Sequence, residues 1–119
     1  MAPGGNPLRM SPGIMVDGFL FVTGMTGSLP DGTMPAAPED QFHATFNKIG
    51  AVLEAAGLGF ADVVDMTSYH INIRTHFDAF AAVRATYVAP PYPTWTAIGV
   101  AELRRDMALV EVKIIARAP

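Results

Sequence analysis

The fold is decided by residues 38–73, which read PEDQFHATFNKIGAVLEAAGLGFADVVDMTSYHINI. Pro38 suits the first turn of a helix, the acidic Glu39 and Asp40 follow where the positive end of the helix dipole favours them, and Gly57 is a natural stop. Between these signals, the side chains of one face recur at helical spacing: Phe42, Thr45, Phe46, Ile49, Val52, Leu53 and Ala56. A helix with a single apolar stripe should cover one face of a sheet.

The end of this stretch, residues 63–73, has the composition of a β-strand. Its alternation predicts one face formed by Thr67, Tyr69, Ile71 and Ile73 and another formed by Ser68, His70 and Asn72. The second set is a polar stripe, which could line a cleft but is more typical of a hydrogen-bonded subunit contact. His70 has no cysteine or acidic neighbour at ligand spacing, so no metal site is expected there. His43 and His76 are expected at the surface.

The remaining segments complete the order β-β-α-β-α-β-β. Strands are predicted at residues 14–23, with a hairpin around Asp17-Gly18, at about 94–103 and at about 108–116. Pro30-Asp31-Gly32 should form a turn, and a second helix should begin at Thr75, with Asp78 completing a capping box. The expected fold is α+β, a single domain over residues 1–119, with both helices on one face of a mixed sheet and the other face bare.

The composition indicates that another chain covers this bare face. Half of the 119 residues are apolar and only 16% are charged. A compact monomer of this size cannot hide all of its apolar side chains. A sheet with one uncovered, partly apolar face needs a partner, and we therefore expect an oligomer.

Composition also disfavours several classes of function. The net charge is −3 and Arg104-Arg105 is the one basic cluster, which argues against a nucleic-acid partner. The absence of cysteine excludes disulfides and thiolate metal sites. No apolar run approaches the roughly 20 residues that span a bilayer, and residues 1–6 do not have the pattern of a signal peptide. We expect a cytoplasmic protein without a membrane partner.

Five segments taken together resemble the RidA/YjgF family, in the family's order and at roughly its spacing. They are VDGFLFVTG at 16–24, AVLEAAG at 51–57, DVV at 62–64, ATY at 85–87 and ALVEV at 108–112. The resemblance implies a chorismate-mutase-like fold and a homotrimer with a central barrel and small-molecule pockets in the clefts between subunits. It also implies hydrolysis of 2-aminoacrylate-type enamines and imines to a keto acid and ammonia, with no metal or organic cofactor.

The chain departs from the family at the residue that binds the substrate's carboxylate. The family uses an arginine in a Pro-Ala-Arg-Ser/Thr motif, whose guanidinium grips both carboxylate oxygens. The matching stretch here is Pro93-Thr94-Trp95-Thr96, and an indole cannot make this fork. Trp95 would be either an aromatic wall of the pocket or an interface residue. Arg9, Arg84 and Arg105 are candidates to supply a guanidinium from another direction, although each is more typical of a solvated or interface residue.

Two family features survive in the sequence. Gly24 corresponds to the glycine whose backbone lines the pocket, and Glu111 to the acid near the attacking water. Glu111 lies within an apolar strand, where a carboxylate needs a polar partner or a wet cavity. It is either a pocket acid/base or the ion-pair partner of Lys113 or of a neighbour's arginine. Thr23, beside Gly24, either donates its hydroxyl to a ligand or simply ends the strand.

These residues leave two functions open. The first is a RidA-like hydrolase or deaminase acting on a C–N bond of a small metabolite, with Glu111 as the catalytic residue. Its substrate-binding residues would be Gly24, Trp95, Thr23, Met10 and Met25, the two methionines standing where the family has a tyrosine and a glutamine. The second is a non-catalytic trimeric protein with a small-molecule-binding or regulatory role. Trp95 and the two methionines favour this second function.

Overall fold

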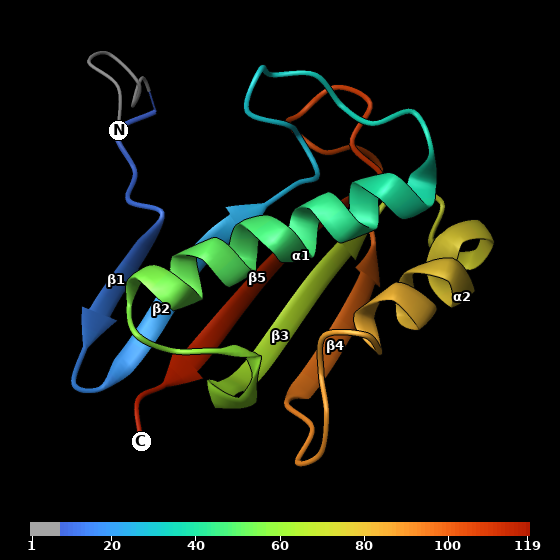
Figure 1. Cartoon of the computed structure of the whole chain (residues 1–119). Coiled ribbons are helices and arrows are strands. Elements are labelled where there is room, and N and C mark those ends of the chain that lie inside the picture. The colour runs from blue at the N-terminus through green and yellow to red at the C-terminus, as the bar shows by residue number, and fades with distance from the viewer. Residues whose placement is uncertain (1–7) are drawn as a thin grey trace.

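The computed structural model describes residues 8–119 and shows the predicted order of strands and helices (Figure 1). The signal-peptide prediction for residues 1–6 lies outside the described residues. The elements are β1 (Gly13–Val16), β2 (Phe19–Met25), α1 (Pro38–Ala55), a 3-10 turn (Phe60–Asp62), β3 (Val63–His70), α2 (Ile73–Arg84), β4 (Thr94–Gly99) and β5 (Val110–Arg117). The strands form one sheet in the order β1-β2-β5-β3-β4. Only the β3–β4 pair is parallel, so the sheet is mixed, as predicted.

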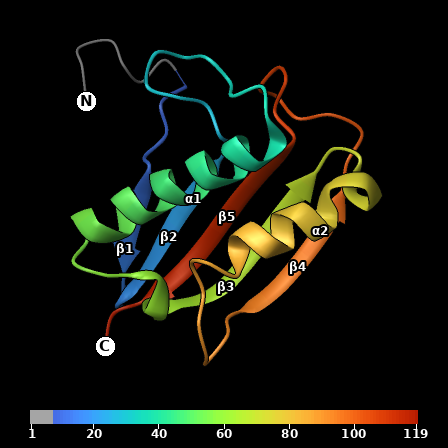
Figure 2. The same ribbon diagram turned by 45° about the vertical axis from the view of Figure 1, so that its right-hand side comes forward.

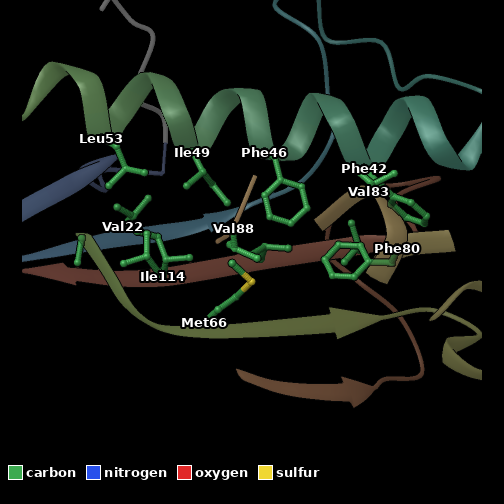
Figure 3. Packing of buried hydrophobic residues seen from close by; sticks show 14 of the residues in the cluster. Val22, Phe42, Phe46, Ile49, Leu53, Met66, Phe80, Val83, Val88 and Ile114 are labelled. Atoms are coloured by element: carbon green, nitrogen blue, oxygen red, sulfur yellow. The ribbon is translucent and has the colours of Figure 1, made fainter. Parts of the chain in front are cut away.

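Both helices pack on the same face of the sheet (Figures 1 and 2). The predicted apolar stripe of α1 is the part that is buried: Phe42, Phe46, Ile49 and Leu53 have no exposed surface. These side chains meet Val22 of β2, Ile114 of β5, Met66 of β3 and Phe80 of α2 in one core (Figure 3). Full burial of such a side chain contributes about 1.5–3 kcal/mol, so this stripe fixes α1 on the sheet.

The predicted strand at residues 14–23 is a hairpin, as expected from Asp17-Gly18. Both turn residues have positive φ, 49° at Asp17 and 81° at Gly18. A two-residue hairpin turn of this kind requires positive φ at both central positions, which Asp tolerates and Gly adopts freely. The turn pairs Val16 with Phe19 and so sets the register of β1 against β2.

The predicted boundary between the third strand and the second helix is wrong. β3 ends at His70, and α2 begins at Ile73 rather than Thr75. Asn72 adopts the left-handed conformation, φ 51°, which interrupts the strand and starts the helix. Thr75 already lies in the first turn, where its N–H donates to the Asn72 carbonyl, so the capping box does not form.

The interpretation of the polar stripe as a subunit contact is also wrong. Ser68 and His70 have no exposed surface. The register pairs them with Val112 and Val110 of β5, which places them on the face covered by the helices. Ser68 and His70 are therefore part of the interior, while Asn72 is exposed and lies beyond the end of β3. The strand face turned away from the helices carries Asp65, Thr67 and Tyr69 instead.

Residues 8–119 leave the face of the sheet opposite the helices uncovered (Figures 1 and 2). It carries large apolar side chains that are 40–53% exposed, namely Ile14, Val16, Phe21 and Ile98. The same face carries Glu111, Lys113 and Ile115 of β5, which is near the middle of the sheet. Exposed apolar groups around a central polar strip are typical of a surface that binds another protein chain.

Candidate functional site

Glu111 and Gly24 are brought together on the uncovered face. Glu111 lies on β5 opposite Tyr69 of β3 and is half-buried. Gly24 lies in the irregular end of β2, where the pairing with β5 shifts between Val22 and Met25. A Cβ at position 24 would stand 2.4 Å from Oε2 of Glu111. Glycine is therefore the residue that leaves room for this carboxylate.

The Glu111 carboxylate has no protein partner within residues 8–119. It makes neither a hydrogen bond nor the alternative ion pair with Lys113, which is two residues along the same strand face. The pairing with an arginine of a neighbouring chain stays a prediction. A carboxylate held on a sheet face, with a glycine above it and both oxygens available, can accept a proton from water or from a ligand.

Thr23 and Met10 also meet, while Met25 lies elsewhere. The Thr23 hydroxyl donates a weak hydrogen bond to Sδ of Met10 at 3.7 Å. Thr23 and Lys113 line a small hollow on the uncovered face together with Ile14 and Phe21. Met25 pairs with the buried Val112 and packs against the core, and it does not line this hollow.

Trp95 lies on the other side of the sheet from Glu111. It belongs to the edge strand β4, and its ring stacks on Phe77 of α2 at 5.3 Å with an angle of 11° between the rings. Its indole N–H donates to the Ser68 hydroxyl at 2.9 Å, and the guanidinium of Arg84 lies 4.0 Å from its ring centroid. Because Trp95 and Glu111 occupy opposite faces, one small molecule cannot contact both within a single chain.

The comparison with known families decides what kind of protein carries this geometry. The family model described as Endoribonuclease L-PSP matches residues 7–118, nearly the whole chain. The chain belongs to this family, the RidA/YjgF family. The name of the family model describes the family and not the activity of this chain.

The RidA/YjgF relatives support the same assignment across the chain. It is 40% identical to the RutC family protein YjgH of Escherichia coli over 93% of this chain and 84% of that protein. It is 29% identical to a 2-iminobutanoate/2-iminopropanoate deaminase of Dermatophagoides farinae, over 88% of this chain and 82% of that protein. Its fold matches the crystal structure of E. coli TdcF with bound serine, with a TM-score of 0.86 and 26% identity over 93% of this chain and 89% of the other.

Beside the RidA/YjgF features, the structure contains a buried polar chain that the sequence interpretation missed. Ser68 Oγ accepts the Trp95 N–H and lies 2.7 Å from Nε2 of His70. The His70 ring is fully buried against Phe80, edge to face, at 4.8 Å, and its Nδ1 has no hydrogen-bond partner. The alternation of Ser68 and His70 was visible in the sequence, but nothing in it indicated that the helices cover this face.

The three candidate arginines have different surroundings. Arg9 is exposed, and Arg105 donates to the carbonyl of Gly32 in the loop before α1. Arg84, at the end of α2, is only 9% exposed and rests on Trp95. Residues 8–119 contain no cluster of three histidine, cysteine, aspartate or glutamate side chains that would hold a metal ion, and none of their helices is long and apolar enough to cross a membrane.

Burial of His70 predicts an acid-sensitive fold. Desolvation lowers the pKa of His70 from its ordinary value of 6.5 to about 4. The unfolded chain therefore binds more protons between these values, and the free energy of unfolding should fall as the pH drops through this window, by at most about 1.4 kcal/mol per pH unit. Urea unfolding of wild type and His70→Gln at pH 7, 5.5 and 4.5 measures this slope. Parallel pH dependences of the two proteins would contradict the prediction.

Proposed function

We propose that this RidA/YjgF-family protein hydrolyses a C–N bond of an enamine, imine or related small metabolite, with Glu111 as the acid/base. The observation that carries the proposal is the half-buried Glu111 carboxylate beneath Gly24, which has no partner within residues 8–119. The proposal is supported by the 2-iminobutanoate/2-iminopropanoate deaminase among the relatives. It requires no metal or organic cofactor.

The reaction needs one group that moves a proton in both directions. Glu111 would take a proton from water as the water oxygen bonds to the imine carbon, while the imine nitrogen gains a proton from solvent. This forms an amino alcohol. Glu111 would then give its proton to the amino group, the C–N bond would break to release ammonia, and the remaining hydroxyl would return a proton to solvent to leave a carbonyl compound. Water and imine are consumed, and carbonyl compound and ammonia are formed.

The site is proposed to lie between two chains of a homotrimer. Trp95 and Glu111 lie on opposite faces of one sheet, so a cleft that uses both must take them from different chains. The exposed apolar groups of the uncovered face are the surface through which the chains would associate. Thr23, Met10 and Trp95 are proposed to line the cleft, with Met25 supporting it from the core side.

The trimer is itself a testable expectation. Burial of the uncovered face between three sheets should make the assembly stable at micromolar concentration. Light scattering should then give three times the chain mass of 12.7 kDa. A stable monomer would contradict both the homotrimer and the proposed site between two chains.

The proposed reaction is tested by measuring ammonia release from a panel of imines, enamines and small amides generated in the assay. We expect at least one compound to be hydrolysed well above the uncatalysed rate. The second candidate function, a non-catalytic binding protein, is favoured by Trp95 and the apolar residues around it. Tight binding of a panel member with no release of ammonia from any of them would support that alternative.

A further inference from the structure

Arg84 is a cation that the described chain leaves without a counter-ion. Its side chain is 91% buried, since 9% is exposed, and residues 8–119 supply no carboxylate to pair with it. Its Nε donates only to the thioether sulfur of Met66, at 3.3 Å. A sulfur is a weak acceptor, and a buried charge without a strong partner is unfavourable. The environment of Arg84 is therefore incomplete without an anion.

The Nη donors of Arg84 form no hydrogen bond within residues 8–119. The guanidinium lies on the Trp95 ring at 4.0 Å, a cation–π contact that fixes its plane. His70 Nδ1 is the one fully enclosed side-chain nitrogen or oxygen without a hydrogen bond in residues 8–119. The Nη atoms of Arg84, which also form none, are therefore not fully enclosed. Burial lowers the pKa of Arg84, and the charge of Tyr92 acts in the opposite direction.

The Trp95 ring on which Arg84 lies is itself fixed by contacts with Ser68 and Phe77. Its N–H is bound by Ser68, and Ser68 is bound by the buried His70. Phe77 stacks on the same indole. The indole therefore has one orientation, and the guanidinium that rests on it has little freedom. A preorganised donor pair of this kind loses little entropy when it binds a ligand.

We infer that Arg84 is an anion-binding residue which takes the carboxylate of a small organic acid through its Nη atoms, with Trp95 as its platform and Ser68 and His70 as positioning residues. Planar guanidinium donors match the two oxygens of a carboxylate. This inference rests on the proposed function in one respect: the bound acid is a substrate only if its reacting carbon lies at the proposed site. The binding itself requires no turnover.

The test uses 2-oxobutanoate, a stable keto acid, and its neutral amide, 2-oxobutanamide. Trp95 is the only tryptophan and lies beside Arg84, so its fluorescence reports occupancy directly. Wild type should show a saturable change with the acid and bind the amide at least about tenfold more weakly, as expected for loss of a charged hydrogen bond. Arg84→Met, which keeps a side chain that can lie on the indole, should lose this preference. Arg84→Lys should retain part of it.

Several outcomes would overturn the inference. They are equal binding of acid and amide by wild type, no saturation with the acid, or unchanged acid affinity in Arg84→Met. If Arg84→Met does not fold, the inference is still tested by Arg84→Lys and by the comparison of acid and amide binding in wild type. A large loss of melting temperature in Arg84→Met, with no acid binding by wild type, would identify a structural ion pair with a neighbouring chain. If Arg84→Met hydrolyses an imine with an unchanged KM, the inference about Arg84 fails and the proposed function stands. If wild type binds the acid through Arg84 but hydrolyses no imine, the proposed function fails and the inference stands.

Discussion

Hydrolysis of 2-iminopropanoate, the imine form of 2-aminoacrylate, by this protein is expected to be at least roughly a hundredfold slower, in kcat/KM, than by a relative with the Pro-Ala-Arg-Ser/Thr motif. A bidentate charge-assisted contact is worth a few kcal/mol, and about 1.4 kcal/mol is tenfold in rate. Trp95 occupies that strand position and its N–H is already bound to Ser68. We propose that Arg84 holds an acid from α2 instead, with its Nε turned to Met66, and a carboxylate bound there would be displaced from the strand position.

The measurement is keto-acid release from enzymatically generated imino acids, with both proteins in the same assay. The matched control is the relative with its motif arginine replaced by tryptophan, which should lose a similar factor. Larger imino acids should be less affected than 2-iminopropanoate, since they reach farther from the carboxylate. Equal rates for this protein and the unmodified relative on 2-iminopropanoate would show that Arg84 or another residue does the full work of the missing arginine.

The core was predictable from the sequence because its pattern is local. The spacing of Phe42, Phe46 and Ile49 specifies which face of α1 is buried, whatever the helix packs against. The hairpin at Asp17-Gly18 was predictable for a similar reason, since a turn depends on the conformations open to its own residues. Glu111 and Gly24 could be paired as site residues only through the family resemblance, because they are far apart in the chain.

The polar interior was not predictable from local pattern. Whether Ser68 and His70 face the helices or a neighbour depends on the register of β3 against β5, which alternation alone does not specify. The start of α2 depended on one left-handed residue, Asn72, whose conformation competes with the capping signal at Thr75. The face occupied by Trp95 follows from parallel pairing of β4 with β3, a contact between segments separated by a whole helix.

Replacement of Glu111 by glutamine is expected to lower turnover of the preferred substrate by about 10² to 10⁴, the usual contribution of a general acid/base. Glutamine keeps the shape of the side chain and removes its basicity. The fold should tolerate the change, because the carboxylate makes no hydrogen bond or ion pair within residues 8–119. Gly24→Ala should act in the same direction, since its Cβ would stand 2.4 Å from Oε2 and displace the carboxylate.

The control for these two variants is Arg117→Met, which changes an exposed side chain of the same strand face outside the hollow that Thr23 and Lys113 line. Its turnover should stay within a few fold of wild type while the trimer persists. Ligand binding, measured through Trp95 fluorescence, should persist in Glu111→Gln as well. A matching loss in all three variants would indicate a damaged sheet face rather than a lost proton acceptor.

The most direct test of the account is a paired measurement on Glu111→Gln: ammonia release from the best imine or enamine substrate, and the melting temperature of the same preparation. Turnover is expected to fall at least a hundredfold, while the melting temperature stays close to that of wild type. Unchanged turnover with a clearly lowered melting temperature would contradict it, since the carboxylate would then be the partner of a neighbouring cation, left unpaired by the substitution.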